Sequence, residues 1–165
     1  MKYMYAPWRA KYVQKQTGKD KECVFCTAIK SVKDALHHII YRSTTWYLLM
    51  NKYPYNVGHL LMIPTDHIAD IQNLSCQAQQ EGFALIARTS AILKNTLLAH
   101  GINVGINMGK AAGASILDHL HVHILPRWEG DTNFFPTLAK IKHVSVDIET
   151  LYIQLKAAFE ERSSL

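Results

Sequence analysis

Three histidines at strict two-residue spacing, His119, His121 and His123, constrain this chain more than any other feature of its sequence. Apolar residues separate them, and two of these, Val122 and Ile124, are β-branched and favour a strand. In a strand, this alternation puts all three imidazoles on one face, each about 6.5 Å from the next. In a helix, the same spacing would scatter the rings around the axis. We therefore expect a strand that forms the wall of an active site.

Length and charge exclude several classes of protein. The 165 residues suffice for one core and no linker or repeat divides them, so we expect a single domain over 1–165 with an N-terminal arm over 1–22. No membrane-spanning run or signal peptide is apparent, which predicts a cytoplasmic protein without a membrane partner. The net charge of +5 suits an anionic ligand, but the basic residues are dispersed, so nucleic-acid binding is not indicated.

The remaining strands are expected to form an antiparallel sheet with the histidine strand. Short apolar segments bounded by turn residues, and one cleanly alternating segment, predict strands at 38–42, 45–50, 59–63 and 102–108. About five strands in all, with connections this short, indicate an antiparallel arrangement.

Two helices are expected to cover this sheet. Ser75 is a suitable N-cap for a long helix over about 76–99. Its buried stripe is expected to contain Phe83, Ile86, Ser90, Leu93 and Leu97. A C-terminal helix is expected over 147–161. The predicted fold class is therefore α+β.

Two of the three cysteines, Cys23 and Cys26, form a Cys-x-x-Cys motif. In a reducing compartment this motif is typical of half a zinc site or of a redox pair. A redox pair normally follows a strand, and none is apparent before Cys23. Zinc is therefore favoured, provided that two more ligands exist.

The aligned imidazoles allow two kinds of chemistry. They can hold a catalytic metal ion, or the central ring can act as a nucleophile while its neighbours assist. The spacing along one strand is wide for a single ion, which favours the nucleophile. The preceding loop, 109–115, contains Gly113 and Ser115, whose backbone N–H groups and hydroxyl could bind an anion.

Three motifs, His-Leu-His-Val-His-Ile-Leu at 119–125, Gly-His-Leu-Leu-Met-Ile-Pro at 58–64 and Cys-Val-Phe-Cys at 23–26, resemble the histidine-triad (HIT) superfamily of nucleotidyl hydrolases and transferases. The resemblance implies a homodimer that acts on a purine nucleotide or dinucleoside polyphosphate. It implies that His121 attacks the α-phosphorus and forms a nucleotidyl-histidine intermediate. His123 would assist the phosphate and the leaving group, and His59 would steady the nucleophile or the phosphate.

The same resemblance assigns the remaining site residues. Asn51 matches a position that binds ribose hydroxyls, although it could equally cap its turn, and Asn107 and Ser115 match positions that face phosphates. In zinc-bearing bacterial members, the positions of a structural zinc ion's ligands match Cys23, Cys26, His67 and His119.

One departure from the common pattern concerns the acceptor. Ala114 stands where the family usually has glutamine, and residues 126–134 look like the bacterial branch related to diadenosine tetraphosphate phosphorylase. In that branch inorganic phosphate can replace water as the acceptor. Three alternatives to hydrolysis therefore stay open: phosphorolysis, a nucleotide-sensing module with little turnover, and a catalytic three-histidine metal centre.

Overall fold

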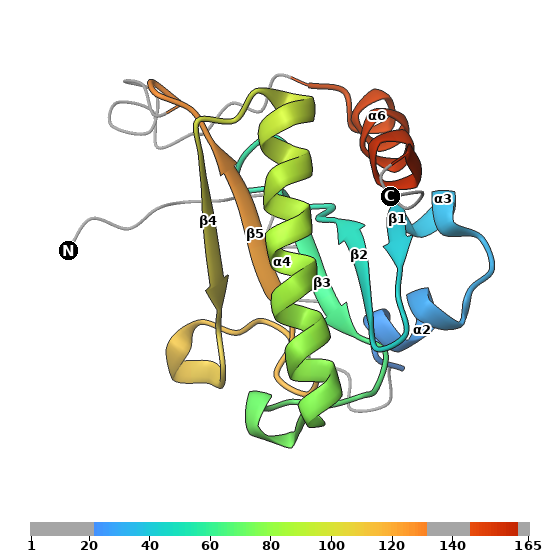
Figure 1. Ribbon diagram of the computed structural model, residues 1–165. Helices are drawn as coiled ribbons and strands as arrows, with labels where there is room; N and C mark the ends of the chain where they lie inside the picture. Colours follow the sequence, from blue (N-terminus) through green and yellow to red (C-terminus); the bar gives the residue numbers. More distant parts are fainter. Residues whose placement is uncertain (1–21, 132–145, 162–165) are drawn as a thin grey trace.

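Five strands form one antiparallel sheet in the computed structural model, which describes residues 22–131 and 146–161 (Figure 1). Their order across the sheet is β1-β2-β3-β5-β4. The strands are β1 (Ile39–Arg42), β2 (Trp46–Met50), β3 (Leu60–Pro64), β4 (Gly101–Ile106) and β5 (Val122–Arg127). The sequence prediction of an α+β fold with a five-stranded antiparallel sheet is confirmed. The expected N-terminal arm, apart from its last residue, lies outside the described residues.

Strand alternation separates the two faces of the sheet. Leu60 and Met62 of β3 face the main core, beneath α4 (Cys76–Leu97) and α6 (Ile148–Glu161). Leu61 and Ile63 face the opposite side, where they pack with Phe25 of α2 (Val24–Lys30). Leu61 pairs with His123 of β5, so the ring of His123 lies on the α2 side of the sheet. The two long helices, α4 and α6, therefore cover one face of the sheet, and α2 and loops cover the face that carries His123.

The long helix begins and ends close to the predicted bounds. Ser75 is its N-cap, and the Ser75 hydroxyl accepts a hydrogen bond from the Ala78 N–H at 3.1 Å. The predicted buried stripe is wrong at Phe83, which is 78% exposed. The buried residues are Ala78, Gly82, Leu85, Thr89, Ile92 and Leu93.

Trp46 explains this shift of the stripe. Its indole packs against the first turns of α4 and donates a hydrogen bond to the Ala78 carbonyl at 2.7 Å. A Cβ atom at Gly82 would lie 2.9 Å from the indole ring. The helix therefore turns small residues toward the sheet where Trp46 fills the space, and Phe83 points to solvent.

The C-terminal helix is confirmed, and α6 buries Leu151, Tyr152, Leu155 and Phe159. The connections contain three further short helices, α3 (Asp34–His37), η1 (Ile71–Asn73) and η2 (Lys110–Ala112). No helix within the described ranges is long and apolar enough to cross a membrane.

The histidine strand is shorter than predicted. β5 begins at Val122, so His119 and His121 precede it. The Leu120 N–H instead donates a hydrogen bond to the Ile68 carbonyl at 2.6 Å, so this segment contacts the loop after β3. The rings still share one side of the sheet, because Phe25 of α2 contacts His119 and His121, with ring centroids 5.5 and 5.4 Å apart.

Candidate functional site

Two buried histidines on neighbouring strands form a hydrogen-bonded pair. His59, just before β3, places its Nε2 2.9 Å from Nδ1 of His123 in β5. The backbone N–H of Tyr55 donates to Nδ1 of His59 at 3.0 Å, so this nitrogen accepts and carries no proton. The proton of neutral His59 is then on Nε2, which donates to His123. His123 accordingly keeps its own proton on Nε2.

Asn51 lies at the start of the same turn. Its Oδ1 accepts a hydrogen bond from the Tyr53 N–H at 2.9 Å, and its Nδ2 lies 3.3 Å from Nδ1 of His59. The side chain therefore caps the turn, which was one of the two roles considered for it, and it also orients His59. The ribose contact stays a prediction.

His121 has a defined tautomer as well. Its Nδ1 lies 3.0 Å from the backbone carbonyl oxygen of His119. Because a carbonyl only accepts, Nδ1 must be the donor, and Nε2 is left as the nitrogen with a free lone pair. Burial lowers the pKa of His121 and outweighs the carbonyl bond that favours the protonated ring. The ring is therefore held neutral, as a nucleophile requires.

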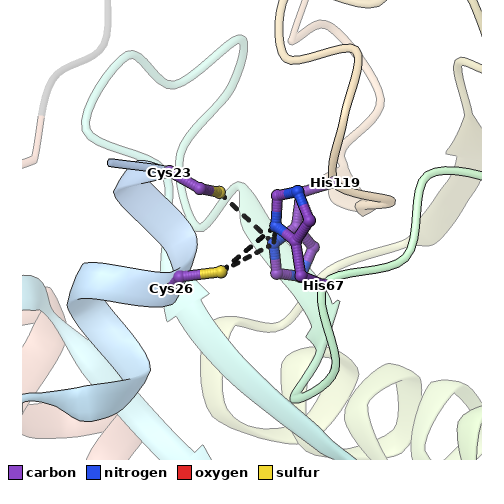
Figure 2. Close-up of side chains that lie close together, drawn as sticks. All are labelled: Cys23, Cys26, His67 and His119. Atoms are coloured by element: carbon purple, nitrogen blue, oxygen red, sulfur yellow. Dashed lines mark hydrogen bonds between the residues drawn. The ribbon is translucent and has the colours of Figure 1, made fainter. Parts of the chain in front are cut away.

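A second cluster lies next to this ring, and Figure 2 shows its four side chains converging. Nδ1 of His119 is 3.3 Å from Sγ of Cys23, 3.6 Å from Sγ of Cys26 and 3.2 Å from Nδ1 of His67. Sγ of Cys26 is 3.2 Å from Nδ1 of His67. All four ligand atoms lie within 4.8 Å of one another. The sequence prediction named the four residues that the structure brings together.

Four of the six distances among these ligand atoms, 3.2–3.6 Å, are close to those of a tetrahedral zinc site. Zinc bonds of about 2.3 Å to sulfur and 2.0–2.1 Å to nitrogen give tetrahedral edges of roughly 3.3–3.8 Å. Nε2 of His119 lies 3.0 Å from the Pro64 carbonyl and donates to it, so the lone pair of Nδ1 faces the cluster. Burial of the ring lowers the pKa of His119, which keeps it neutral and able to bind a metal.

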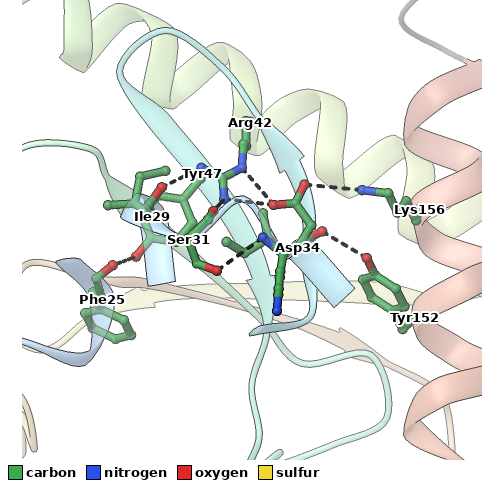
Figure 3. Close-up of polar contacts among 10 residues, drawn as sticks. Phe25, Ile29, Ser31, Asp34, Arg42, Tyr47, Tyr152 and Lys156 are labelled. Carbon is green, nitrogen blue, oxygen red and sulfur yellow. Dashed lines mark hydrogen bonds and ion pairs between the residues drawn. The ribbon is translucent and has the colours of Figure 1, made fainter. Parts of the chain in front are cut away.

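The short helix that presents the cysteines is docked by its own polar contacts (Figure 3). The Tyr47 hydroxyl donates to the Phe25 carbonyl at 2.8 Å. The Arg42 guanidinium donates to the carbonyls of Ile29 and Ser31, both at 2.8 Å, and forms an ion pair with Asp34 at 2.8 Å. These hydrogen bonds fix α2 to β1 and β2. The backbone that carries the two cysteines is therefore held in place beside the cluster.

The predicted phosphate-binding residues lie on the connection from β4 to β5. Asn107 follows Ile106, whose partner Val122 follows His121, so Asn107 and His121 lie at the same end of the sheet. Gly113 ends η2 with a φ of +89°, a conformation that favours glycine. Ser115 comes two residues later, and its contact with a phosphate stays a prediction.

Sequence reasoning missed Tyr55. Its ring centroid lies 4.6 Å from that of His59 and 5.6 Å from that of His123, to which it is nearly parallel at 19°. Turn residues usually point to solvent, so nothing in the sequence places this ring on the His59–His123 pair. Its position immediately before Asn56, Val57 and Gly58-His59 is the only signal.

The comparisons with known proteins agree with this geometry. The family model of the HIT domain matches residues 32–130, which include His59, the three spaced histidines and the loop before them. The chain belongs to the HIT domain family. The AP-4-A phosphorylase of Mycobacterium tuberculosis is 36% identical over 116 residues, which cover 70% of this chain and 60% of that protein. The chain thus spans less than two thirds of that HIT relative's length.

Two solved structures of HIT proteins extend the comparison. A Zn-bound histidine triad family protein from Mycobacterium smegmatis is 28% identical, covers 87% of this chain and 96% of its own, and superposes with a TM-score of 0.71. A hypothetical histidine triad nucleotide-binding protein from Sulfolobus tokodaii is 27% identical, covers 84% and 93%, and has a TM-score of 0.68.

Proposed function

We propose that this HIT protein is a nucleotidyl hydrolase or transferase that cleaves the α-phosphate linkage of adenosine-type nucleotides and dinucleotides. The observation that carries the proposal is the 3.0 Å contact between Nδ1 of His121 and the His119 carbonyl. It leaves Nε2 of a neutral imidazole as the nucleophile, beside a second imidazole that carries a donor N–H. Nucleophilic catalysis of phosphoryl transfer needs a nucleophile with a free lone pair and a nearby donor for the developing negative charge.

The reaction then has two steps. In the first, the lone pair of His121 Nε2 forms a bond to the α-phosphorus, and the bond from phosphorus to the bridging oxygen breaks. The electron pair leaves with that oxygen, and the product is a nucleotidyl-imidazolium whose Nδ1–H stays on the His119 carbonyl. In the second, an oxygen of water or inorganic phosphate forms a bond to the phosphorus, and the bond from phosphorus to Nε2 breaks. Its electron pair returns to Nε2, and the proton of the attacking oxygen passes to solvent water.

His123 and His59 assist the leaving oxygen. Nε2–H of His123 is the donor that stabilises negative charge on the leaving group or the phosphate. His59 supports this tautomer through its 2.9 Å contact with Nδ1 of His123. The ring centroids of His121 and His123 are 5.1 Å apart, which is close enough for one phosphate group to contact both rings.

The proposed substrate contacts surround this pair. Asn51 would bind the ribose hydroxyls with the hydrogen-bonding capacity that its turn contacts leave over. Asn107, Gly113 and Ser115 would contact the phosphates from the β4–β5 connection. The positive φ of Gly113 shapes this turn, in which the Gly113 N–H donates to the Lys110 carbonyl at 3.0 Å.

Phosphorolysis is the second candidate, with inorganic phosphate as the acceptor. Two observations favour it. One is the 36% identity to the AP-4-A phosphorylase of Mycobacterium tuberculosis, and the other is Ala114 in place of the usual glutamine. Dinucleoside polyphosphates would be substrates in both cases. The products distinguish the reactions.

Zinc is the proposed occupant of the cluster of Cys23, Cys26, His67 and His119. The gathering of the four ligand atoms within 4.8 Å of one another supports this, as does the Zn-bound relative from Mycobacterium smegmatis. Four protein ligands close the coordination sphere, so the ion would hold these side chains together and leave no position for a catalytic water. We further propose a cytoplasmic homodimer, in which the edge strand β4 continues the sheet into the second chain.

Product analysis with and without phosphate tests the proposal. Incubation with diadenosine tetraphosphate should give AMP and ATP in water if the enzyme hydrolyses, and ADP and ATP with phosphate if it is a phosphorylase. Rapid quenching and peptide mapping should find the AMP adduct on His121. A protein that binds the dinucleotide without turnover under either condition would instead be a nucleotide sensor, and the proposal would be wrong.

A further inference from the structure

A buried asparagine lies in the turn just before His59. Asn56 is 5% exposed, and its Nδ2 donates to the Pro126 carbonyl at 2.9 Å and to Oδ2 of Asp131 at 2.8 Å. These partners are about 70 residues away in the sequence, at the end of β5. A buried amide with both N–H groups in use fixes the backbone that carries it.

The Asp131 carboxylate is itself held in place. It accepts hydrogen bonds from Nε and Nη2 of Arg127, at 2.6 and 2.8 Å, and lies 3.3 Å from the Trp128 N–H. Its side chain is only 8% exposed. Bidentate charge-assisted contacts of this kind are among the strongest in proteins. Asp131 therefore presents a rigid acceptor to Asn56.

The turn is pressed against the same strand end at a second point. Gly58 has a φ of +69°, and a Cβ atom there would lie 2.7 Å from Leu97 Cδ1 and 3.1 Å from Pro126 Cγ. Inside the turn, the His59 N–H donates to the Asn56 carbonyl at 3.2 Å. The backbone between Tyr55 and His59 consequently has little freedom.

We propose that Asn56, anchored by Asp131, is a positioning residue for the His59–His123 pair. The anchored turn aims the Tyr55 N–H at Nδ1 of His59, and this contact at 3.0 Å, together with Asn51 Nδ2 at 3.3 Å, selects the tautomer that donates to His123. His123 must then carry its proton on Nε2, toward the leaving oxygen. Asn56 and the Asp131 side chain are buried and act through the turn, and this role rests on the function proposed above.

The rate loss caused by removing this anchor should depend on the leaving group. A hydrogen-bond donor matters more when the departing oxygen holds more negative charge. Phenol has a pKa of about 10, like the tyrosine side chain, and nitrophenol is much more acidic. Loss of the anchored turn should therefore slow cleavage of the phenyl ester of AMP more than cleavage of the p-nitrophenyl ester.

The test compares three proteins on these two esters. Asn56→Ala should lower kcat for the phenyl ester on the order of tenfold more than for the nitrophenyl ester, with KM little changed. Asn103→Ala is the matched control, because the exposed Asn103 Oδ1 also accepts a hydrogen bond from Arg127, at 2.8 Å, while Asn103 lies in β4 and outside the turn. The control should keep both rates. An equal loss on both esters in Asn56→Ala would overturn the positioning role.

A second variant and a direct readout cover the case in which Asn56→Ala does not fold. Asp131→Asn retains the side-chain shape and should show the same selectivity to a smaller degree. Imidazole ¹⁵N chemical shifts should show His59 protonated at Nε2 in the unaltered protein and mixed tautomers in the variant. Unchanged tautomers would contradict the inference. An unaltered protein that cleaves neither ester would refute the proposed function itself, and with it this role.

Discussion

The His119 carbonyl oxygen lies 3.0 Å from Nδ1 of His121, and Nδ1 of the same His119 lies 3.3 Å from Sγ of Cys23. One residue thus belongs to both parts of the site. Its backbone sets the tautomer of the proposed nucleophile, and its ring faces the cluster proposed to bind zinc. The equal spacing of the three histidines hides this division of roles.

Replacement of the nucleophile should separate binding from turnover. His121→Ala removes the proposed nucleophile, so we expect turnover of diadenosine tetraphosphate to fall at least about a thousandfold. Affinity for a nonhydrolysable analogue, measured by calorimetry, should change little. His37→Ala, in α3 and away from the site, is the control and should retain full activity. Substantial activity in His121→Ala would exclude this ring as the nucleophile.

Loss of one cysteine should remove the metal. Elemental analysis should find one zinc ion per chain in the unaltered protein and almost none in Cys26→Ser, because three ligands bind zinc far more weakly than four. The variant should also melt roughly 5 °C or more lower. Cys76→Ser is the matched control, since Cys76 is exposed and outside the cluster. Equal zinc in the two variants would show that the cluster is not the site.

Breaking the hydrogen bond between His59 and His123 should lower the rate of turnover more than the affinity for substrate. His59→Phe keeps an aromatic ring but removes the donor to His123, so we expect kcat to fall by about 10- to 100-fold with KM nearly constant. The ¹⁵N shifts of His123 should change from one tautomer to a mixture. If His123 kept its tautomer without His59, the 2.9 Å contact would have no role in orienting it.

Two neighbouring positions on α4 test the corrected packing. Leu85 is 4% exposed and Phe83 is 78% exposed. Leu85→Ala should lower the free energy of unfolding by about 2–5 kcal/mol, because it leaves a cavity under the sheet. Phe83→Ala should change it by about 0.5 kcal/mol or less. Urea denaturation measures both changes. A larger effect at Phe83 than at Leu85 would mean that Phe83 is buried, as the sequence pattern predicts.

Local patterns in the sequence were sufficient for most of the fold. Alternation and turn residues located all five strands, and Ser75 marked the start of α4 correctly. The stripe on that helix was placed wrongly at Phe83, because the deciding contact comes from Trp46 on a distant strand. Helical periodicity shows which apolar residues share a helix face, but not which face a ring from another element will contact.

The residues of the cysteine–histidine cluster could be named from the sequence through the family resemblance. Cys23, Cys26, His67 and His119 meet as the family resemblance implied. Asn56 and Asp131 gave no such signal, because asparagine and aspartate are common in exposed turns. Their burial and their contact at 2.8 Å depend on how the turn before β3 meets the end of β5, which only the tertiary structure shows.

The stereochemistry at the α-phosphorus tests the central claim most directly. A substrate with sulfur in place of one nonbridging oxygen, and with a defined configuration at that phosphorus, is cleaved in isotopically labelled water or with inorganic phosphate. The configuration of the product is then determined. Attack by His121 followed by attack of the acceptor involves two in-line displacements, each with inversion, so the account predicts net retention. Net inversion would mean a single displacement by water or phosphate, and would contradict a nucleotidyl-histidine intermediate.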